Sequence, residues 1–78
     1  MITLYINPNC AYCAKTVEVA KEVEAPLILK DIHDPVFAAE LMELGGKRQM
    51  PFMVDDETST MLYESDDIMK YLHKQFGS

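Results

Sequence analysis

The sequence predicts an α/β fold in which a mixed four-stranded sheet carries helices on both faces, in the order β-α-β-α-β-β-α. Two observations predict it. Short segments rich in β-forming residues alternate with segments whose apolar residues recur every three or four positions. The chain has 78 residues, of which 49% are hydrophobic. This length suits one core, and we expect a single domain over residues 1–78.

The first half of the chain predicts a β-α-β unit. Residues Ile2 to Ile6 alternate and favour a strand, and a turn at residues 7–9 follows. From Cys10 to about Glu24 the apolar residues recur with a helical period. Pro26 ends this helix, and Leu27 to Ile32 predicts a strand parallel to the first. The buried face of the helix is expected to hold Cys13, Val17 and Ala20.

A second helix is predicted to begin at Asp34 and Pro35, which suit the N-cap and the first helical position. The pair Gly45-Gly46 supplies a left-handed cap that ends this helix. Apolar residues recur along it at intervals of four and three positions. We expect its buried stripe to consist of Phe37, Leu41 and Leu44.

The last third of the chain predicts a hairpin and a final helix. Strands are expected at Phe52 to Asp55 and at Thr60 to Tyr63, joined by a polar turn at residues 56–59. Ser65 is expected to cap the final helix, where acidic residues at positions 66 and 67 suit the positive first turn. The buried stripe of this helix is expected to be Ile68, Leu72 and Phe76.

Composition and charge exclude several classes of function. Thirteen acidic against seven basic side chains give a net charge of −6, which argues against binding to a nucleic-acid backbone. Apolar runs such as Pro26 to Leu29 are far shorter than the ~20 residues that a membrane span needs. The first residues predict a strand rather than a secretory signal. We therefore expect a cytoplasmic monomer that binds neither nucleic acid nor a membrane.

The two cysteines, Cys10 and Cys13, form a C-x-x-C motif at the predicted start of the first helix. A disulfide between cysteines this close does little to stabilise a fold, so we expect a chemical role in a reducing compartment. Free N–H groups at a helix N-terminus favour a thiolate, which makes Cys10 the expected nucleophile. Cys13, one turn further along, is placed to resolve a mixed disulfide formed on Cys10.

Two other interpretations of the cysteines remain open. In the first, they are an inert buried pair. In the second, Cys10 and Cys13 bind zinc together with His33 and His73. The spacing between Cys13 and these histidines matches no compact zinc pattern, so we predict no metal site and expect both histidines at the surface.

A C-x-x-C motif directly after the first strand of such a pattern is typical of thioredoxin-like folds. Within these folds the chain resembles the glutaredoxin family through three motifs that span nearly the whole sequence. The motifs are Cys10-Ala11-Tyr12-Cys13, Gln49-Met50-Pro51 and Glu64-Ser65-Asp66-Asp67. Tyr12 and the third motif are also similar to the N-terminal domain of glutathione transferases.

The resemblance implies a glutathione site. In the family the proline that matches Pro51 is cis and faces the cysteines, and Met50 would offer its backbone to the cysteinyl part of glutathione. Ser65 and the free N–H groups around it would bind the γ-glutamyl carboxylate, and Asp66 would pair with the ammonium. Tyr12 completes this implied site. Glutathione is thus implied as a co-substrate, without a tightly bound cofactor.

From the residues alone, each of these features also has a purely structural interpretation. Pro51 suits the first position of an edge strand, and the segment that begins at Ser65 caps a helix whether or not a ligand binds. The basic pair Lys47-Arg48 would lie near the site by analogy with the family, where it would meet the glycyl carboxylate, or it is simply solvated. These alternatives stay open at the level of sequence.

The resemblance implies a glutathione-dependent reductase of protein disulfides and of glutathione mixed disulfides. Thioredoxin reductase is an alternative source of electrons for the same chemistry. Ala11 stands where many dithiol glutaredoxins have proline. It keeps open a module in which two subunits hold an iron–sulfur cluster through Cys10 and glutathione.

Other departures from the glutaredoxin pattern flank the motifs. Asn7-Pro8-Asn9 stands where a lysine is frequent, and Tyr63-Glu64 stands where a Gly-Gly pair is frequent. The Glu64-Ser65 pair at this place is more similar to the pattern of glutathione transferases. We do not expect a full glutathione transferase. Its second, helical domain would have to follow the thioredoxin-like one, and the chain ends soon after Phe76.

Overall fold

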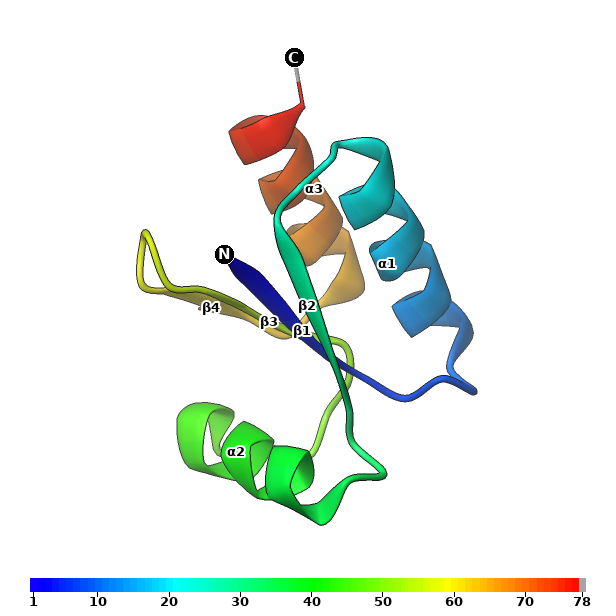
Figure 1. The fold of residues 1–78 in the computed structure, drawn as a ribbon, viewed down its shortest axis with the longest axis vertical. Helices are drawn as coiled ribbons and strands as arrows, with labels where there is room; N and C mark the ends of the chain where they lie inside the picture. The colour runs from blue at the N-terminus through cyan, green and yellow to red at the C-terminus, as the bar shows by residue number, and fades with distance from the viewer. Residues whose placement is uncertain (78) are drawn as a thin grey trace.

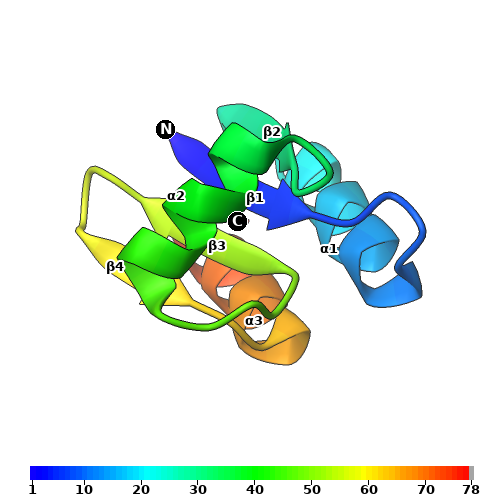
Figure 2. The same ribbon diagram turned by 90° about the horizontal axis from the view of Figure 1, so that it is seen from below.

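The computed structural model describes residues 1–77, which form a four-stranded sheet in the order β2-β1-β3-β4 (Figures 1 and 2). Strand β1 pairs in parallel with β2 and antiparallel with β3, and β3 pairs antiparallel with β4. The mixed sheet and the parallel first pair are as the sequence predicts. The strands are β1 (Ile2–Ile6), β2 (Leu27–Asp31), β3 (Phe52–Asp55) and β4 (Thr60–Leu62).

Three helices lie in the described range: α1 (Ala11–Glu22), α2 (Pro35–Gly45) and α3 (Ser65–Phe76). Figure 1 shows α1 and α3 side by side on one face of the sheet and α2 alone on the other. The predicted arrangement with helices on both faces is therefore confirmed. None of these helices within residues 1–77 is long and apolar enough to cross a membrane.

The core divides into two clusters because successive side chains of a strand point to opposite faces of the sheet. Ile2 and Leu4 of β1 face α1 and α3, whereas Tyr5 faces α2. The larger cluster consists of Ile2, Leu4, Ala20, Ala25, Met53, Ile68 and Leu72. The smaller cluster consists of Tyr5, Ile32, Leu41 and Phe52.

Strand β1 and helix α2 are also linked by polar contacts. The Oε1 atom of Glu40 accepts a hydrogen bond of 2.8 Å from the Tyr5 hydroxyl and forms a 2.7 Å ion pair with Lys30. The ammonium group of Lys30 lies 5.4 Å from the centre of the Tyr5 ring. These contacts fix α2 on the sheet, and with it the loop that follows α2.

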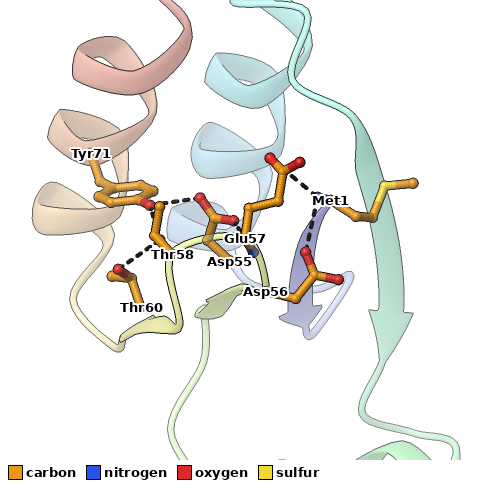
Figure 3. Close-up of polar contacts among 7 residues, drawn as sticks. All are labelled: Met1, Asp55, Asp56, Glu57, Thr58, Thr60 and Tyr71. Atoms are coloured by element: carbon orange, nitrogen blue, oxygen red, sulfur yellow. Dashed lines mark hydrogen bonds and ion pairs between the residues drawn. The ribbon is translucent and has the colours of Figure 1, made fainter.

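A second set of polar contacts closes the β3–β4 turn (Figure 3). Asp55, which is only 3% exposed, accepts hydrogen bonds from the Tyr71 hydroxyl at 2.6 Å and from the Glu57 N–H at 3.0 Å. The Thr58 hydroxyl lies 2.6 Å from that of Tyr71. The amino group of Met1 donates to Asp56 at 3.0 Å. Tyr71 thereby joins α3 to the end of β3.

Helix α1 is shorter than predicted at both ends. Cys10 is its N-cap rather than its first residue, and the helix ends at Glu22 rather than at about Glu24. Glu24 has a left-handed backbone (φ 57°), and the Ala25 N–H donates to the Ala20 carbonyl at 3.0 Å. This is the Schellman pattern of helix termination, so the chain turns before Pro26 is reached.

Other boundaries differ by one residue, and one predicted cap is wrong. Strand β2 ends at Asp31 and β4 at Leu62, each one residue before the predicted end. Helix α3 has Glu64 rather than Ser65 as its N-cap, because the Glu64 carbonyl already accepts the Ile68 N–H at 2.9 Å. The Glu64 side chain makes no capping hydrogen bond.

The predicted buried stripe of α2 is correct only in its first part. Leu41 is buried and Phe37 half-buried, but Leu44 is 45% exposed. The face that contacts the sheet continues from Leu41 to Gly45, four positions further on. There the ring of Tyr63 occupies the space that a side chain would need. Leu44 is turned away from this contact.

Candidate functional site

The two cysteines lie where β1 passes into α1. Cys10 is half-buried and extended (φ −95°, ψ 123°), and its carbonyl accepts the Ala14 N–H at 3.1 Å. Its own N–H donates to the Asn7 carbonyl at 3.0 Å, so the turn after β1 holds Cys10 at the helix start. Cys13 lies one turn further into the helix and is only 1% exposed. Both thiols are free.

The two thiols have opposite electrostatic environments. The backbone N–H of Cys13 lowers the pKa of Cys10, with further help from the Cys13 side chain and the Tyr12 N–H, against the effect of burial. Burial raises the pKa of Cys13 to about 11. Cys10 is therefore the thiol that ionises more readily, and the helix N-terminus supplies the main cause, as expected from the sequence.

This difference predicts how each thiol is alkylated. The reaction of Cys10 with iodoacetamide should show a midpoint below the value of about 8.5 for a free cysteine, because only the thiolate reacts. The rate is measured from pH 4 to 10 by mass spectrometry. A Cys10→Ser variant serves as control, and its Cys13 should react slowly and only at high pH. A midpoint at or above the free value would remove the electrostatic argument for Cys10.

Beside the dithiol, three segments of the chain enclose a pocket of about 340 Å³. They are the first turn of α1, the loop before β3 and the N-terminus of α3. Such a volume lies within the range of small-molecule sites. The pocket is lined by Tyr12, Gln49, Met50, Pro51, Tyr63, Glu64, Ser65 and Asp66.

The structure brings together all five residues that the resemblance placed at a glutathione site. Tyr12 is 67% exposed at the edge of the pocket, Pro51 is buried, and Met50 and Ser65 are half-buried. Asp66 is exposed, and the Met50–Pro51 peptide bond is cis. Their contact with glutathione stays a prediction. Cys10 itself is not part of the lining, although Tyr12 two positions later is.

The pocket walls carry groups of opposite electrostatic character. At the start of α3, backbone N–H groups without intrahelical partners favour a carboxylate. The carboxylates of Glu64 and Asp66 in the same wall favour a cation such as an ammonium group. The pocket thus suits a zwitterionic ligand, such as the amino-acid end of a peptide. Lys47 and Arg48 are exposed and do not line it.

Sequence analysis missed three residues of this lining, namely Gln49, Tyr63 and Glu64. The Gln49 side chain donates to Oε1 of Glu64 at 3.1 Å, which joins the loop before β3 to the start of α3. Tyr63 hydrogen-bonds to the backbone of Lys47 in the same loop. Gln49 and Glu64 belong to motifs quoted above. Nothing local in the sequence indicates that the loop before β3 and the start of α3 are in contact.

The histidines lie apart from the cysteines. His33 is exposed, and its Nδ1 atom lies 2.8 Å from Oδ1 of Asp31. His73 is exposed on α3. Within residues 1–77, no three side chains of His, Cys, Asp or Glu lie close enough together to hold a metal ion.

Comparison with known proteins agrees with this geometry. Residues 4–78 match the family model described as "Glutathione S-transferase, N-terminal domain". A delta-class glutathione transferase from Nilaparvata lugens is 31% identical, with a TM-score of 0.83 over 100% of this chain. Glutathione S-transferase 1-6 from Anopheles dirus species B is 27% identical, with a TM-score of 0.80 over 97% of this chain.

A glutathione transferase homologue from Sulfitobacter, solved with bound glutathione, is 16% identical and covers 97% of this chain with a TM-score of 0.80. At that identity the likeness concerns the fold alone. No curated protein sequence matches. The chain spans only 37%, 36% and 37% of the lengths of these three structures.

Proposed function

The chain belongs to the family of glutathione S-transferase N-terminal domains, and we propose that it acts as a glutathione-dependent thiol–disulfide oxidoreductase. Its substrates would be glutathione mixed disulfides and protein disulfides. The observation that carries the proposal is the pair of thiols with opposite environments. Cys10 is stabilised as a thiolate at the helix N-terminus, and Cys13 is buried one turn away. A transferase needs no second thiol at this place.

The reaction proposed for a mixed disulfide uses Cys10 alone. The Cys10 thiolate attacks the glutathione sulfur, which forms a Cys10–glutathione disulfide and releases the protein thiolate, which takes up a proton. A second glutathione thiolate attacks the glutathione sulfur of this intermediate. Glutathione disulfide leaves, and the Cys10 thiolate is restored. The low pKa of Cys10 favours its attack in the first step and its departure in the second.

A protein disulfide needs the second cysteine as well. After Cys10 has formed a disulfide with one sulfur of the substrate, Cys13 loses its proton to water and attacks the Cys10 sulfur. The reduced substrate leaves, and a Cys10–Cys13 disulfide remains. Two glutathione molecules reduce this disulfide and become glutathione disulfide.

The pocket beside the dithiol would hold the glutathione. We propose that the backbone of Met50 pairs with the cysteinyl unit, in the manner of an added strand edge. The start of α3, with the hydroxyl of Ser65, would bind the γ-glutamyl carboxylate, and Asp66 would pair with the ammonium. The support for this assignment is that these residues line one pocket and carry groups complementary to an amino acid.

Replacing Asp66 by asparagine should raise the KM for glutathione mixed disulfides by about threefold to tenfold, because an exposed but hydrogen-bonded charge pair is lost. Steady-state kinetics measures the change. Asp67→Asn is the matched control: it removes the same charge from the same helical turn but lies outside the pocket lining. Equal KM values for both variants and the wild type would show that Asp66 does not contact glutathione and only places a negative charge at the helix N-terminus.

A second candidate function is glutathione conjugation. The family model and the 31% identity to a delta-class transferase favour it. It would need the Cys10 thiolate or the pocket to activate the thiol of bound glutathione for attack on an electrophile. Cys13 would then have no chemical role, which is the reason why we favour thiol–disulfide exchange.

Parallel assays on the same preparation separate these functions. Reduction of a glutathionylated peptide, coupled to NADPH through glutathione reductase, should proceed. Conjugation of glutathione to 1-chloro-2,4-dinitrobenzene should be weak. Turnover only with thioredoxin reductase would identify another electron donor, and a brown colour after anaerobic purification would indicate an iron–sulfur cluster. Efficient conjugation without disulfide reduction would overturn the proposal in favour of a transferase.

A further inference from the structure

We propose that Tyr63 is a positioning residue that sets the width of the glutathione pocket by holding the loop of residues 46–50 against the start of α3. This inference rests on the proposed function, because it concerns the binding of glutathione. Tyr63 directly precedes Glu64, the N-cap of α3, and so belongs to one wall of the pocket. Its hydroxyl group reaches the chain that forms the opposite wall.

The Tyr63 hydroxyl makes two hydrogen bonds to one residue of that loop. It donates to the Lys47 carbonyl at 2.9 Å and accepts from the Lys47 N–H at 3.1 Å. The ammonium group of Lys47 also lies over the ring, 5.6 Å from its centre. Both backbone groups of Lys47 are thus hydrogen-bonded to a side chain 16 positions away. These bonds tie the loop to the residue that directly follows β4.

The Tyr63 ring is itself held in place by contacts with β3 and with the end of α2. It packs on Phe52, a fully buried residue of β3, with ring centres 4.5 Å apart. At the end of α2, a Cβ atom on Gly45 would overlap the Tyr63 hydroxyl and ring. The hydroxyl can therefore reach Lys47 only because residue 45 is glycine. Nothing in the pattern of an α2 C-terminus requires a glycine there, since Gly46 supplies the left-handed cap (φ 78°).

The contact matters for binding because the loop carries Gln49 and Met50, which line the pocket opposite Glu64. A further side-chain contact between these walls is the 3.1 Å hydrogen bond from Gln49 to Glu64. This bond and the two bonds of the Tyr63 hydroxyl lie at the surface of the protein. Without the Tyr63 hydroxyl, the loop would spend part of its time away from α3. A ligand that contacts both walls then binds more weakly, because its apparent Kd rises as the inverse of the fraction of molecules in which the loop lies against α3.

The test is the Tyr63→Phe variant, which keeps the ring on Phe52 and removes only the hydroxyl. The KM for a glutathionylated peptide should rise by about threefold to tenfold, the range that corresponds to one neutral hydrogen bond. The kcat should change much less, because the lost interaction is the same before and during reaction. Hydrogen exchange of the Lys47 amide, followed by NMR without ligand, should accelerate.

Tyr71→Phe is the matched control, since Tyr71 does not line the pocket. The hydroxyl that it removes binds Asp55 at the end of β3 (Figure 3). It should lower the melting temperature without raising KM. Gly45→Ala, which displaces the Tyr63 ring, should raise KM in the same direction as Tyr63→Phe. An unchanged KM in Tyr63→Phe, or an equal rise in Tyr71→Phe, would overturn the role of Tyr63. A wild-type protein that does not reduce the glutathionylated peptide would instead contradict the proposed function itself.

Discussion

Replacing Cys10 by serine is expected to reduce disulfide reduction to the uncatalysed rate with every substrate. A serine hydroxyl is not ionised at the helix N-terminus, and Cys13 is too buried and too weakly acidic to take over the attack. The measurement is NADPH oxidation coupled to glutathione reductase, once with a glutathionylated peptide and once with a protein disulfide. Circular dichroism shows whether the variant is folded.

Cys13→Ser is the matched control for this experiment, because it removes the other thiol of the same motif. It should still reduce the glutathionylated peptide, where external glutathione resolves the intermediate on Cys10. It should fail with a protein disulfide that needs an internal resolving thiol. An active Cys10→Ser protein combined with an inactive Cys13→Ser protein would reverse the assignment of nucleophile and resolving thiol.

Those parts of the fold that depend on nearest neighbours could be predicted from the sequence. Asp34 accepts the Val36 N–H at 2.9 Å and Pro35 opens α2, both as the residue types indicate. Gly46 ends α2 in the left-handed conformation for the same reason. The position of the dithiol follows likewise, since a strand and a helix flank it directly.

The predictions fail where the local pattern allows more than one outcome. The apolar period of α2 predicts a buried Leu44, but the ring of Tyr63 lies against Gly45 and Leu44 is exposed. The residue types predict Ser65 as the cap of α3, but the backbone enters the helix one residue earlier, at Glu64. The apolar period of α2 allows Leu44 to be buried or exposed, and the residues at the start of α3 allow either Glu64 or Ser65 as the N-cap. Local sequence rules therefore do not decide between these alternatives.

The same limit applies to the candidate site. The five predicted glutathione residues were placed by family resemblance, and the pocket that unites them forms only when the loop before β3 meets α3. The contacts of Tyr63 with Lys47 and of Gln49 with Glu64 span 16 and 15 positions. No spacing rule covers pairs at that separation, because tertiary packing of α2 on the sheet creates them.

The largest loss of stability is expected from Asp55→Ala. Asp55 is 3% exposed, and its two oxygens accept hydrogen bonds from the Tyr71 hydroxyl and the Glu57 N–H (Figure 3). Alanine would leave both donors without this acceptor and remove the polar link between α3 and the end of β3. We expect the free energy of unfolding to fall by about 2–4 kcal/mol. Thermal and urea unfolding of both proteins measure the difference.

That loss would be severe for a domain of this length. A chain of 78 residues is expected to have roughly 4–12 kcal/mol of stability in total. The melting temperature should therefore fall by about 8–30 °C. Asp56→Ala is the matched control, because the neighbouring Asp56 is exposed and contacts only the amino group of Met1. Its removal should change the free energy of unfolding by less than about 1 kcal/mol.

The charge of Asp55 also makes stability depend on pH. Burial acts to raise the pKa of Asp55, but the hydrogen bonds from Tyr71 and Glu57 outweigh it and hold the pKa below its ordinary value. The unfolded chain therefore takes up the proton at a higher pH than the folded protein does. The stabilisation is complete above about pH 5 and is lost as the pH falls below about 4, through the pKa of the folded state.

Asp55→Asn isolates this charge, since asparagine has the same size and keeps an acceptor for the Glu57 N–H. Its melting temperature should fall less steeply than that of the wild type between about pH 5 and pH 3. Asp31 and Glu40, whose pKa values are also lowered by their hydrogen-bond partners, remain in both proteins. The difference between the two pH profiles therefore reports Asp55 alone. The prediction would be wrong if the melting temperatures of Asp55→Asn and the wild type fell equally with pH and if Asp55→Ala lost little free energy of unfolding. Tyr71 and the β3–β4 turn would then form hydrogen bonds with other partners, and the contact with Asp55 would contribute little to the packing of α3 on the sheet.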